Sequence, residues 1–202
     1  TNEGLALLAE GNHPQEIETA GKKAGMPVGP LAVIDEINLG LVSQIRKQTR
    51  KDLATEGKEL PLIPADQVID LMTEKINRLG RAQGGGFYEY PENGKKYLWP
   101  ELQTHFPIAK DPLTQDQMIE RILFIQAIET IRAYEENVVT SVAEANIGSI
   151  FGWGFSPEKG GTLQFINDYG IKKFEKRSQE LYKKYGKRFT PPKMLIKMAS
   201  NK

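Results

Sequence analysis

One pattern occurs twice in this chain, once in each half. The first copy covers residues 13–20 and 25–36, and the second covers residues 141–148, 152–157 and 163–168. Each copy predicts a capped helix, an elbow rich in glycine and proline, and a second helix. An internal repeat constrains the architecture before any single motif is interpreted. Two related halves are therefore expected. Ala20 and Leu31 are 11 positions apart, whereas Ala145 and Leu163 are 18 positions apart, so the second elbow is seven residues longer than the first.

The spacing of apolar residues predicts a mainly α fold. Thr114 and Gln117 form a capping box before the longest predicted helix, residues 114–137, in which Ile125 is expected in the core. An Asn-Gly pair between aromatic-rich runs predicts one small β-hairpin near residues 87–99. We expect two tandem helical domains, residues 1–105 and 106–202.

Two local predictions concern the first half. Pro30, Ile34, Ile37, Leu41 and Ile45 follow the three-or-four spacing of a buried stripe on a single helix. Residues 46–59 carry many charges and are expected to be a helix end that runs into a solvated loop.

Composition narrows the functional classes. The 27 Lys and Arg nearly balance the 26 Asp and Glu, so the net charge of +1 gives no broad electrostatic reason to bind nucleic acid. The absence of cysteine excludes disulfides and thiolate chemistry, and the two histidines, His13 and His105, lack the spacing of metal ligands. No apolar run is long enough to span a membrane. The sequence therefore predicts a soluble, cytoplasmic protein with no metal site, in which His13 caps a helix.

Three further features have a structural and a functional interpretation. Residues 84–86 are three glycines that lack the context of a phosphate-binding loop, so a turn is predicted. Gly152 and Gly154 follow a helix instead of a strand, which excludes a dinucleotide fingerprint. Asp35 and Asp168 recur at equivalent places in the two copies. A catalytic carboxylate pair and hydrogen bonding at helix ends both remain open for them.

Several spaced motifs in order resemble one enzyme family. They are Gly-Met-Pro-Val-Gly-Pro-Leu from Gly25 with Asp35-Glu36, then Gly-Gly-Gly-Phe-Tyr-Glu-Tyr from Gly84, then Ala-Glu-Ala-Asn-Ile-Gly-Ser-Ile-Phe-Gly-Trp-Gly-Phe-Ser-Pro from Ala143. This series resembles the C-terminal region of 3-hydroxyacyl-CoA dehydrogenases, whose helical domain is like that of 6-phosphogluconate dehydrogenase. The duplication is most similar to the bifunctional enoyl-CoA hydratase/3-hydroxyacyl-CoA dehydrogenases of fatty-acid β-oxidation.

The resemblance implies hydride transfer between a 3-hydroxyacyl thioester and NAD. In the family, a Rossmann domain binds NAD and carries the catalytic His–Glu pair upstream of the helical region. Residues 1–10 read as the end of a helix, so the chain is expected to be a fragment that is inactive alone and holds no catalytic or cofactor-binding residue. Acyl-CoA substrate, the Rossmann and hydratase domains and a thiolase subunit are the implied partners, and self-association of the fragment is expected.

One residue is implied to contact substrate. The bacterial bifunctional enzymes have a substrate-contacting Tyr before the second elbow, and the matching residue here is Phe151. Apolar contact is retained without the hydroxyl, and a packed core Phe is the alternative. In the first copy, Asn38 and Gly40 depart from the family pattern, which has Gly and Asp there. Asn tolerates a left-handed helix terminus, so the fold is expected to survive the first change.

Two functions of different classes follow. The first is a non-catalytic part of a β-oxidation dehydrogenase that supplies one wall of the acyl-CoA cleft and supports the other domains. The second is a ligand-free helical scaffold or oligomerisation module. Metabolism of 3-hydroxybutyryl-CoA differs from the first only in acyl length, which the elbow residues do not reveal.

Overall fold

The computed structural model describes residues 1–201, which divide into two compact units. Unit 1 comprises Thr1–Lys22 and Val28–Met118, and unit 2 comprises Lys23–Pro27 and the chain from Ile119 onward. The described chain is mainly helical, as the sequence predicted. The expectation of one domain copy in residues 1–105 and another in 106–202 stays a prediction.

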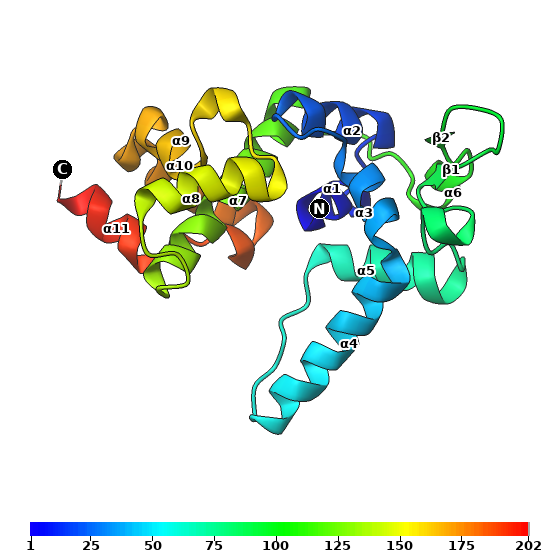
Figure 1. Cartoon of the computed structure of the whole chain (residues 1–202), viewed down its shortest axis with the longest axis horizontal. Helices are drawn as coiled ribbons and strands as arrows, with labels where there is room; N and C mark the ends of the chain where they lie inside the picture. Colours follow the sequence, from blue (N-terminus) through cyan, green and yellow to red (C-terminus); the bar gives the residue numbers. More distant parts are fainter. Residues whose placement is uncertain (202) are drawn as a thin grey trace. The chain divides into compact units, whose positions relative to one another are not determined.

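Unit 1 is a group of helices with one small hairpin (Figure 1). Its elements are α1 (Asn2–Ala9), α2 (Pro14–Lys23), α3 (Pro30–Ile37), α4 (Leu39–Thr55), α5 (Pro64–Asp70), the π-helix η1 (Leu71–Lys75), the 3₁₀-helix η2 (Arg81–Gln83), β1 (Tyr88–Glu89), β2 (Tyr97–Leu98) and α6 (Leu102–His105). The core is centred on α1, from which Leu5, Leu7 and Leu8 are fully buried. Helices α3 and α5 pack against α1.

A kink separates α3 from α4 and corrects the predicted stripe. Asn38 has φ 86°, and its side chain accepts a hydrogen bond from Leu41 N at 3.2 Å. The positive φ expected at Asn38 is thus confirmed, but it rotates the buried face of the following helix. Leu39 and Ser43 are buried, whereas Ile37, Leu41 and Ile45 are about half exposed. The single buried stripe from Pro30 to Ile45 was therefore wrong beyond Ile34.

The charged segment after Ile45 is a helix end that runs into a loop, as predicted, and the helical part reaches Thr55. Helix α4 continues to Thr55, and Figure 1 shows the chain then running back as an extended segment to α5. Arg46 and Arg50 both form ion pairs with Asp66, a buried carboxylate, the second at 3.0 Å. Asp66 also accepts a hydrogen bond from Ile63 N at 3.2 Å, which caps α5. These basic side chains therefore stabilise the helix and its neighbour.

The predicted hairpin is confirmed. Strands β1 and β2 pair antiparallel, with Tyr88 opposite Leu98 and Glu89 opposite Tyr97. Trp99 lies just beyond β2, where Arg78 stacks over its indole ring at 4.4 Å. The same guanidinium donates to the carbonyl oxygens of Gly86 and Tyr88 at 2.7 and 3.0 Å. Arg78 thus fastens the start of the hairpin to the helical part of unit 1.

Unit 2 is built from α7 and the helices that follow it. Its elements are α7 (Gln115–Glu135, beginning in unit 1), α8 (Val142–Trp153), the 3₁₀-helix η3 (Pro157–Lys159), α9 (Thr162–Tyr169), α10 (Ile171–Tyr185), the 3₁₀-helix η4 (Lys187–Phe189) and α11 (Lys193–Ser200). Phe124 of α7 stacks on Phe174 of α10 with ring centroids 4.1 Å apart and meets Phe165 of α9 edge-on at 6.0 Å. This aromatic cluster is the centre of the unit 2 core.

The start of α7 agrees with the predicted capping box. Gln117 N donates to Thr114 Oγ1 at 3.3 Å, and Thr114 N donates to Gln117 Oε1 at 3.0 Å. Ile122 and Ile128 are buried as expected, but Ile125 is only partly buried. The core face of α7 instead includes Phe124, so Ile125 was wrongly placed at its centre.

Among residues 1–201, no helix has both the length and the apolar character needed to cross a bilayer.

Candidate functional site

Helix α8 begins and ends at well-defined signals. Ser141 Oγ accepts a hydrogen bond from Glu144 N at 3.1 Å, as the second predicted capping box requires. The Thr140 hydroxyl donates to the Glu144 carboxylate at 2.9 Å, and this bond holds the pKa of Glu144 below its usual value. Gly154, with φ 77°, ends the helix, and Phe155 N then donates to Ser149 O at 2.9 Å. The Ser141 cap at the start of α8 and the glycine at its end are therefore both formed in the structure.

Phe151 lies on the surface of unit 2, near the end of α8. Its side chain is 85% exposed, so the alternative of a packed core phenylalanine is excluded within this unit. Ile147, one helical turn earlier, is 58% exposed on the same face. Gly148 and Gly152 have open space where a Cβ would lie, with no heavy atom within 4 Å. We call Ile147, Gly148, Phe151 and Gly152 the α8 face.

The other side of α8 holds the second elbow in place. Asn146 Oδ1 accepts hydrogen bonds from Leu163 N at 2.9 Å and Gln164 N at 3.1 Å, and so caps α9. A Cβ on Gly161 would lie 2.5 Å from Cα of Asn146, so the elbow approaches α8 closely. The hydrogen bonds of Asn146 thus have a structural role, and the α8 face takes no part in them.

Glu18 caps the corresponding helix, α3, in unit 1. Its Oε1 accepts a hydrogen bond from Leu31 N at 2.7 Å, at the start of α3. The capping residue and the capped amide are 13 positions apart here and 17 apart in the second copy. Counted from the capping residue to the capped amide, the second elbow is four residues longer than the first, whereas the count from Ala20 and Ala145 gave seven. The equivalent contacts support the internal repeat.

Two buried carboxylates of unit 1 share a cluster with two tyrosines. Tyr88 donates its hydroxyl to Glu18 Oε2 at 2.6 Å, and Tyr90 donates its hydroxyl to Asp35 Oδ2 at 3.0 Å. Asp35 also accepts from the backbone N–H groups of Phe87 at 2.8 Å and Tyr88 at 2.9 Å. The carboxylates therefore tie α2 and α3 to the hairpin.

Burial shifts the acidity of this cluster. It raises the pKa of Glu18 and the pKa of Asp35 because the charged form loses its hydration, and the donated hydrogen bonds oppose this only in part. The pKa values of Tyr88 and Tyr90 are also raised, first by burial and then by the neighbouring carboxylates. Both tyrosines therefore stay protonated and act as hydrogen-bond donors.

The predicted turn at the three glycines is confirmed, and its reason is the carboxylate beside it. Gly84 has φ 88°. A Cβ on Gly86 would lie 2.0 Å from Asp35 Oδ1, and one on Gly85 would lie 2.5 Å from Arg78 Nη2. Because Gly85 and Gly86 have no Cβ, the side chains of Arg78 and Asp35 can approach the backbone there. Asp168, by contrast, is exposed and accepts a hydrogen bond from Gln164 within α9. Asp35 therefore bonds to the hairpin, whereas Asp168 bonds only to a neighbour within its own helix in the described contacts.

Both histidines have structural contacts. His13 Nδ1 accepts a hydrogen bond from Gln15 N at 3.1 Å, which confirms helix-cap chemistry at α2. His105 stacks on Trp99, with ring centroids 5.2 Å apart and 20° between the planes. A search of residues 1–201 finds no group of three or more His, Asp and Glu side chains that could hold a metal ion.

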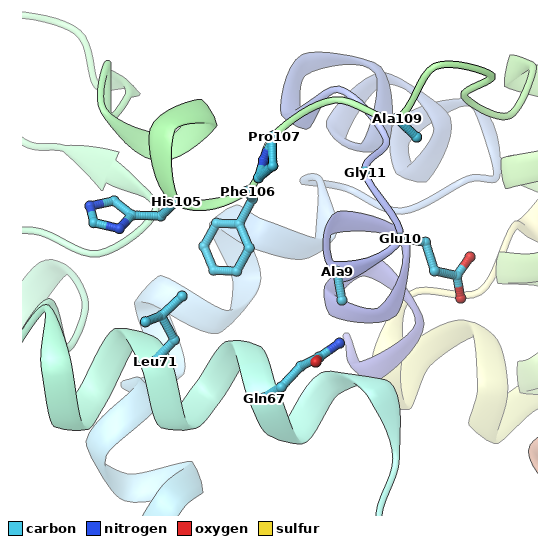
Figure 2. Close-up of a pocket in the computed structure, with 9 residues that line it drawn as sticks. All are labelled: Ala9, Glu10, Gly11, Gln67, Leu71, His105, Phe106, Pro107 and Ala109. Atoms are coloured by element: carbon cyan, nitrogen blue, oxygen red, sulfur yellow. The ribbon is translucent and has the colours of Figure 1, made fainter.

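A pocket of about 310 Å³ lies in unit 1 beside the end of α1 (Figure 2). Leu71, Phe106 and Pro107 give it apolar walls, while Gln67 and Glu10 supply polar groups. In Figure 2 the ring of Phe106 points toward Leu71, whereas the imidazole of His105 points away from the other lining residues. The pocket therefore offers apolar contact and an amide, without a histidine base directed into it.

Sequence reasoning missed the roles of Glu18, Tyr88 and Tyr90. The bond between Tyr88 and Glu18 joins residues 70 positions apart, so no local pattern contains it. Glu18 is buried in the structure, where a carboxylate needs hydrogen-bond donors, but no pattern in the sequence predicted that burial.

Comparison with known proteins connects this geometry to one family. Residues 1–90 match the family model of the 3-hydroxyacyl-CoA dehydrogenase C-terminal domain. The whole second copy of the repeat, including the α8 face, lies outside the matched residues. Its relation to the first copy rests on the shared helix–elbow–helix geometry described above.

Two solved structures share the fold. One is the dehydrogenase part of multifunctional enzyme 1 from C. elegans, 16% identical over 96% of this chain and 44% of that chain, with a TM-score of 0.60. The other is 3-hydroxybutyryl-CoA dehydrogenase from Escherichia coli K12, 17% identical over 98% of this chain and 57% of that chain, with a TM-score of 0.64. The chain thus spans about half the length of each. It is similar in sequence over residues 1–90 to the C-terminal domain of 3-hydroxyacyl-CoA dehydrogenases, and in fold over nearly its whole length to these two solved structures.

Proposed function

We propose that this chain is the non-catalytic helical part of a NAD-dependent 3-hydroxyacyl-CoA dehydrogenase of fatty-acid β-oxidation, in which the α8 face forms one wall of the acyl-CoA cleft. The match over residues 1–90 and the fold shared with two such dehydrogenases support the enzyme class. The duplicated elbow favours the bifunctional type with two helical domains in tandem. Both domains would then support the Rossmann domain.

The exposure of Phe151 is the observation that carries the proposal. A phenyl ring that is 85% exposed gains free energy when a ligand removes it from water, on the order of 2 kcal/mol for full burial. Gly148 and Gly152 strengthen the argument. Each glycine inside a helix costs about 1 kcal/mol relative to alanine, and no neighbour within unit 2 requires either one. A ligand that approaches the backbone closely at this face would explain them.

The contact at Phe151 is apolar. A phenylalanine provides a ring face without a hydroxyl, so it would orient and desolvate an acyl chain and form no hydrogen bond to the thioester. The α8 face would in this way exclude water from the substrate near the reacting carbon.

The described residues do not fit NAD. The sheet of residues 1–201 is a two-stranded antiparallel hairpin, and the space beside Gly85 and Gly86 is occupied by Arg78 and Asp35 respectively. NAD and the catalytic His–Glu pair therefore belong, in this proposal, to a Rossmann domain outside the chain. NAD, when bound there, would accept or donate the hydride, while the 202 residues of this chain would bind and shield substrate.

Binding of acyl-CoA to the purified chain tests the proposal. We expect saturable binding of a medium-chain acyl-CoA by calorimetry, weakened about tenfold or more by Phe151→Ala because the apolar contact is lost. Leu62→Ala is the matched control, since Leu62 is a 79% exposed apolar residue of unit 1. Equal weakening by both variants, or no binding up to about 1 mM, would exclude a substrate wall at α8.

Turnover by the chain is a second test. We expect no reduction of acetoacetyl-CoA by NADH above the rate without protein, because hydride transfer requires an NAD site that these residues do not form. Measurable turnover that is lost with a variant of this chain would contradict the assignment of chemistry to another domain. Titrations with acyl-CoAs of four to sixteen carbons, sampling about the usual range of chain lengths, would separate β-oxidation of long chains from 3-hydroxybutyryl-CoA metabolism.

A ligand-free scaffold that self-associates is the second candidate. Ile37, Leu41 and Ile45 are each about half exposed on unit 1, and exposed apolar side chains favour contact with another surface. Sedimentation of the chain with and without acyl-CoA distinguishes the candidates. Self-association without any acyl-CoA binding would favour the scaffold. The hydratase domain and the thiolase subunit rest on the family resemblance and form part of the first proposal, which also keeps the cytoplasmic location expected from the sequence.

A further inference from the structure

A second pocket lies in unit 1 beside the hairpin and plays no part in the function proposed above. Its volume is about 410 Å³, within the range of small-molecule sites. The lining residues are Glu36, Arg81, Tyr90, Pro91, Gly94 and Lys96. We call this the hairpin pocket. Three of its six residues carry charge, which sets it apart from the mainly apolar pocket of Figure 2.

Two cations flank one aromatic ring in the hairpin pocket. Lys96 Nζ lies 5.9 Å from the centroid of Tyr90, and Arg81 Cζ lies 5.8 Å from it. The Lys96 ammonium is also 5.1 Å from the ring of Tyr88. Such contacts hold cations near a ring without neutralising them. The ring contacts therefore cancel neither positive charge.

Arg81 is oriented by the carboxylate of the pocket. Its Nη1 lies 3.0 and 3.2 Å from the two oxygens of Glu36. A guanidinium has five N–H donors in a rigid fork, and this pair engages Nη1 alone. The remaining donors suit a second oxyanion. With Arg81 and Lys96 against Glu36, the lining has a net charge of +1 and favours an anionic ligand.

The aromatic wall of the pocket is fixed in advance. Tyr90 donates its hydroxyl to Asp35 at 3.0 Å, and Asp35 is itself held by two backbone N–H groups. The ring cannot swing away without breaking a bond to a buried carboxylate. Together with Pro91, it presents a preformed surface to an organic group, which lowers the ordering cost of binding.

We propose that the hairpin pocket binds a phosphorylated small molecule, with the phosphate between Arg81 and Lys96 and the organic group along Tyr90 and Pro91. A phosphate presents three oxygens to a forked guanidinium and an ammonium, which suits this pair of cations. The pocket volume exceeds the space that a single phosphate ion fills, so a phosphate monoester is the fitting class. The proposal does not depend on acyl-CoA binding at the α8 face.

Calorimetric titration of the full chain with phenyl phosphate at low ionic strength tests the proposal. We expect saturable binding that weakens as salt is added, because the contacts are ionic. Arg81→Gln and Lys96→Gln should each weaken binding about tenfold, since each removes a charge-assisted contact. Lys58→Gln is the matched control: Lys58 is an exposed lysine of unit 1, paired with Glu56 at 2.8 Å.

Three results would overturn the proposal. The first is no saturable binding up to about 10 mM. The second is equal weakening by Lys58→Gln, which would indicate general attraction to lysines. The third is binding of benzoate as tight as that of phenyl phosphate, which would refute selectivity for phosphate. Unchanged Trp99 fluorescence in Arg81→Gln and Lys96→Gln verifies that unit 1 is folded in each titration.

Discussion

Replacing Gly86 with alanine should destabilise unit 1 strongly, because the new methyl group would occupy the place of the Asp35 carboxylate. The added Cβ would lie 2.0 Å from Oδ1, 2.5 Å from Cγ and 2.8 Å from Oδ2 of Asp35. The whole carboxylate must therefore move. Three donors then lose their acceptor: Phe87 N, Tyr88 N and the Tyr90 hydroxyl.

The magnitude follows from these three bonds. A buried donor left without an acceptor costs about 1–3 kcal/mol. Phe87 N is buried and would lose its acceptor outright, whereas Tyr88 N and the Tyr90 hydroxyl are only partly buried and would lose less. We therefore expect a loss of about 3–6 kcal/mol in the free energy of unfolding. A typical domain has only about 5–15 kcal/mol in total, so unit 1 would be close to unfolding.

The two tryptophans allow each unit to be followed separately. Trp99 lies in unit 1 and Trp153 in unit 2. Urea denaturation in a Trp153→Phe background reports unit 1 through Trp99 alone. Gly94→Ala is the matched control in the same hairpin, because its Cβ would meet only the Pro91 side chain at 3.2 Å. A loss below about 1 kcal/mol for Gly86→Ala, or a loss equal to that of Gly94→Ala, would refute the reasoning.

Three further predictions concern the buried carboxylate, the unit 2 core and α8. Burial raises the pKa of Glu18 in the folded state, so the protonated side chain contributes stability below its unfolded pKa, and this contribution is lost as pH rises through the folded-state pKa. Urea titrations of wild type and Glu18→Gln should therefore show the wild type losing stability relative to the variant as pH rises. A relative gain would contradict this. Phe124→Ala should lower the stability of unit 2 by about 3–5 kcal/mol, measured through Trp153, because it empties the stacked aromatic centre; a loss below about 1 kcal/mol would be inconsistent with that packing. Gly148→Ala should raise unit 2 stability by about 0.5–1 kcal/mol, since the methyl group meets no atom, while weakening acyl-CoA binding if the α8 face is the substrate wall.

Local signals in the sequence predicted the fold well. The Thr114–Gln117 box, the Ser141 cap and the hairpin all depend on residues a few positions apart, and all are present in the structure. The stripe through Ile45 failed because one residue, Asn38, breaks the helix and turns the next one about its axis. Periodicity alone cannot detect such a rotation, since both faces of α4 carry apolar side chains.

The candidate site was less predictable because its contacts are remote in sequence. Asp35 was identified as notable, but its partners lie more than 50 positions away in the hairpin. The motif at Phe151 gave the position of a contact and left open whether the ring was packed or exposed. That choice depends on which face of α8 the elbow covers, and the cap from Asn146 determines it.

The pairing of Glu18 with one elbow and Asn146 with the other gives the two halves different responses to heat. An amide does not titrate, so the Asn146 cap in unit 2 works alike in acid and in neutral buffer, whereas unit 1 loses stability as the buried Glu18 carboxylate ionises, because the charge is deprived of its hydration. In a scanning calorimeter the melting temperature of unit 1 should therefore fall relative to that of unit 2 as the buffer pH rises through the folded-state pKa of Glu18.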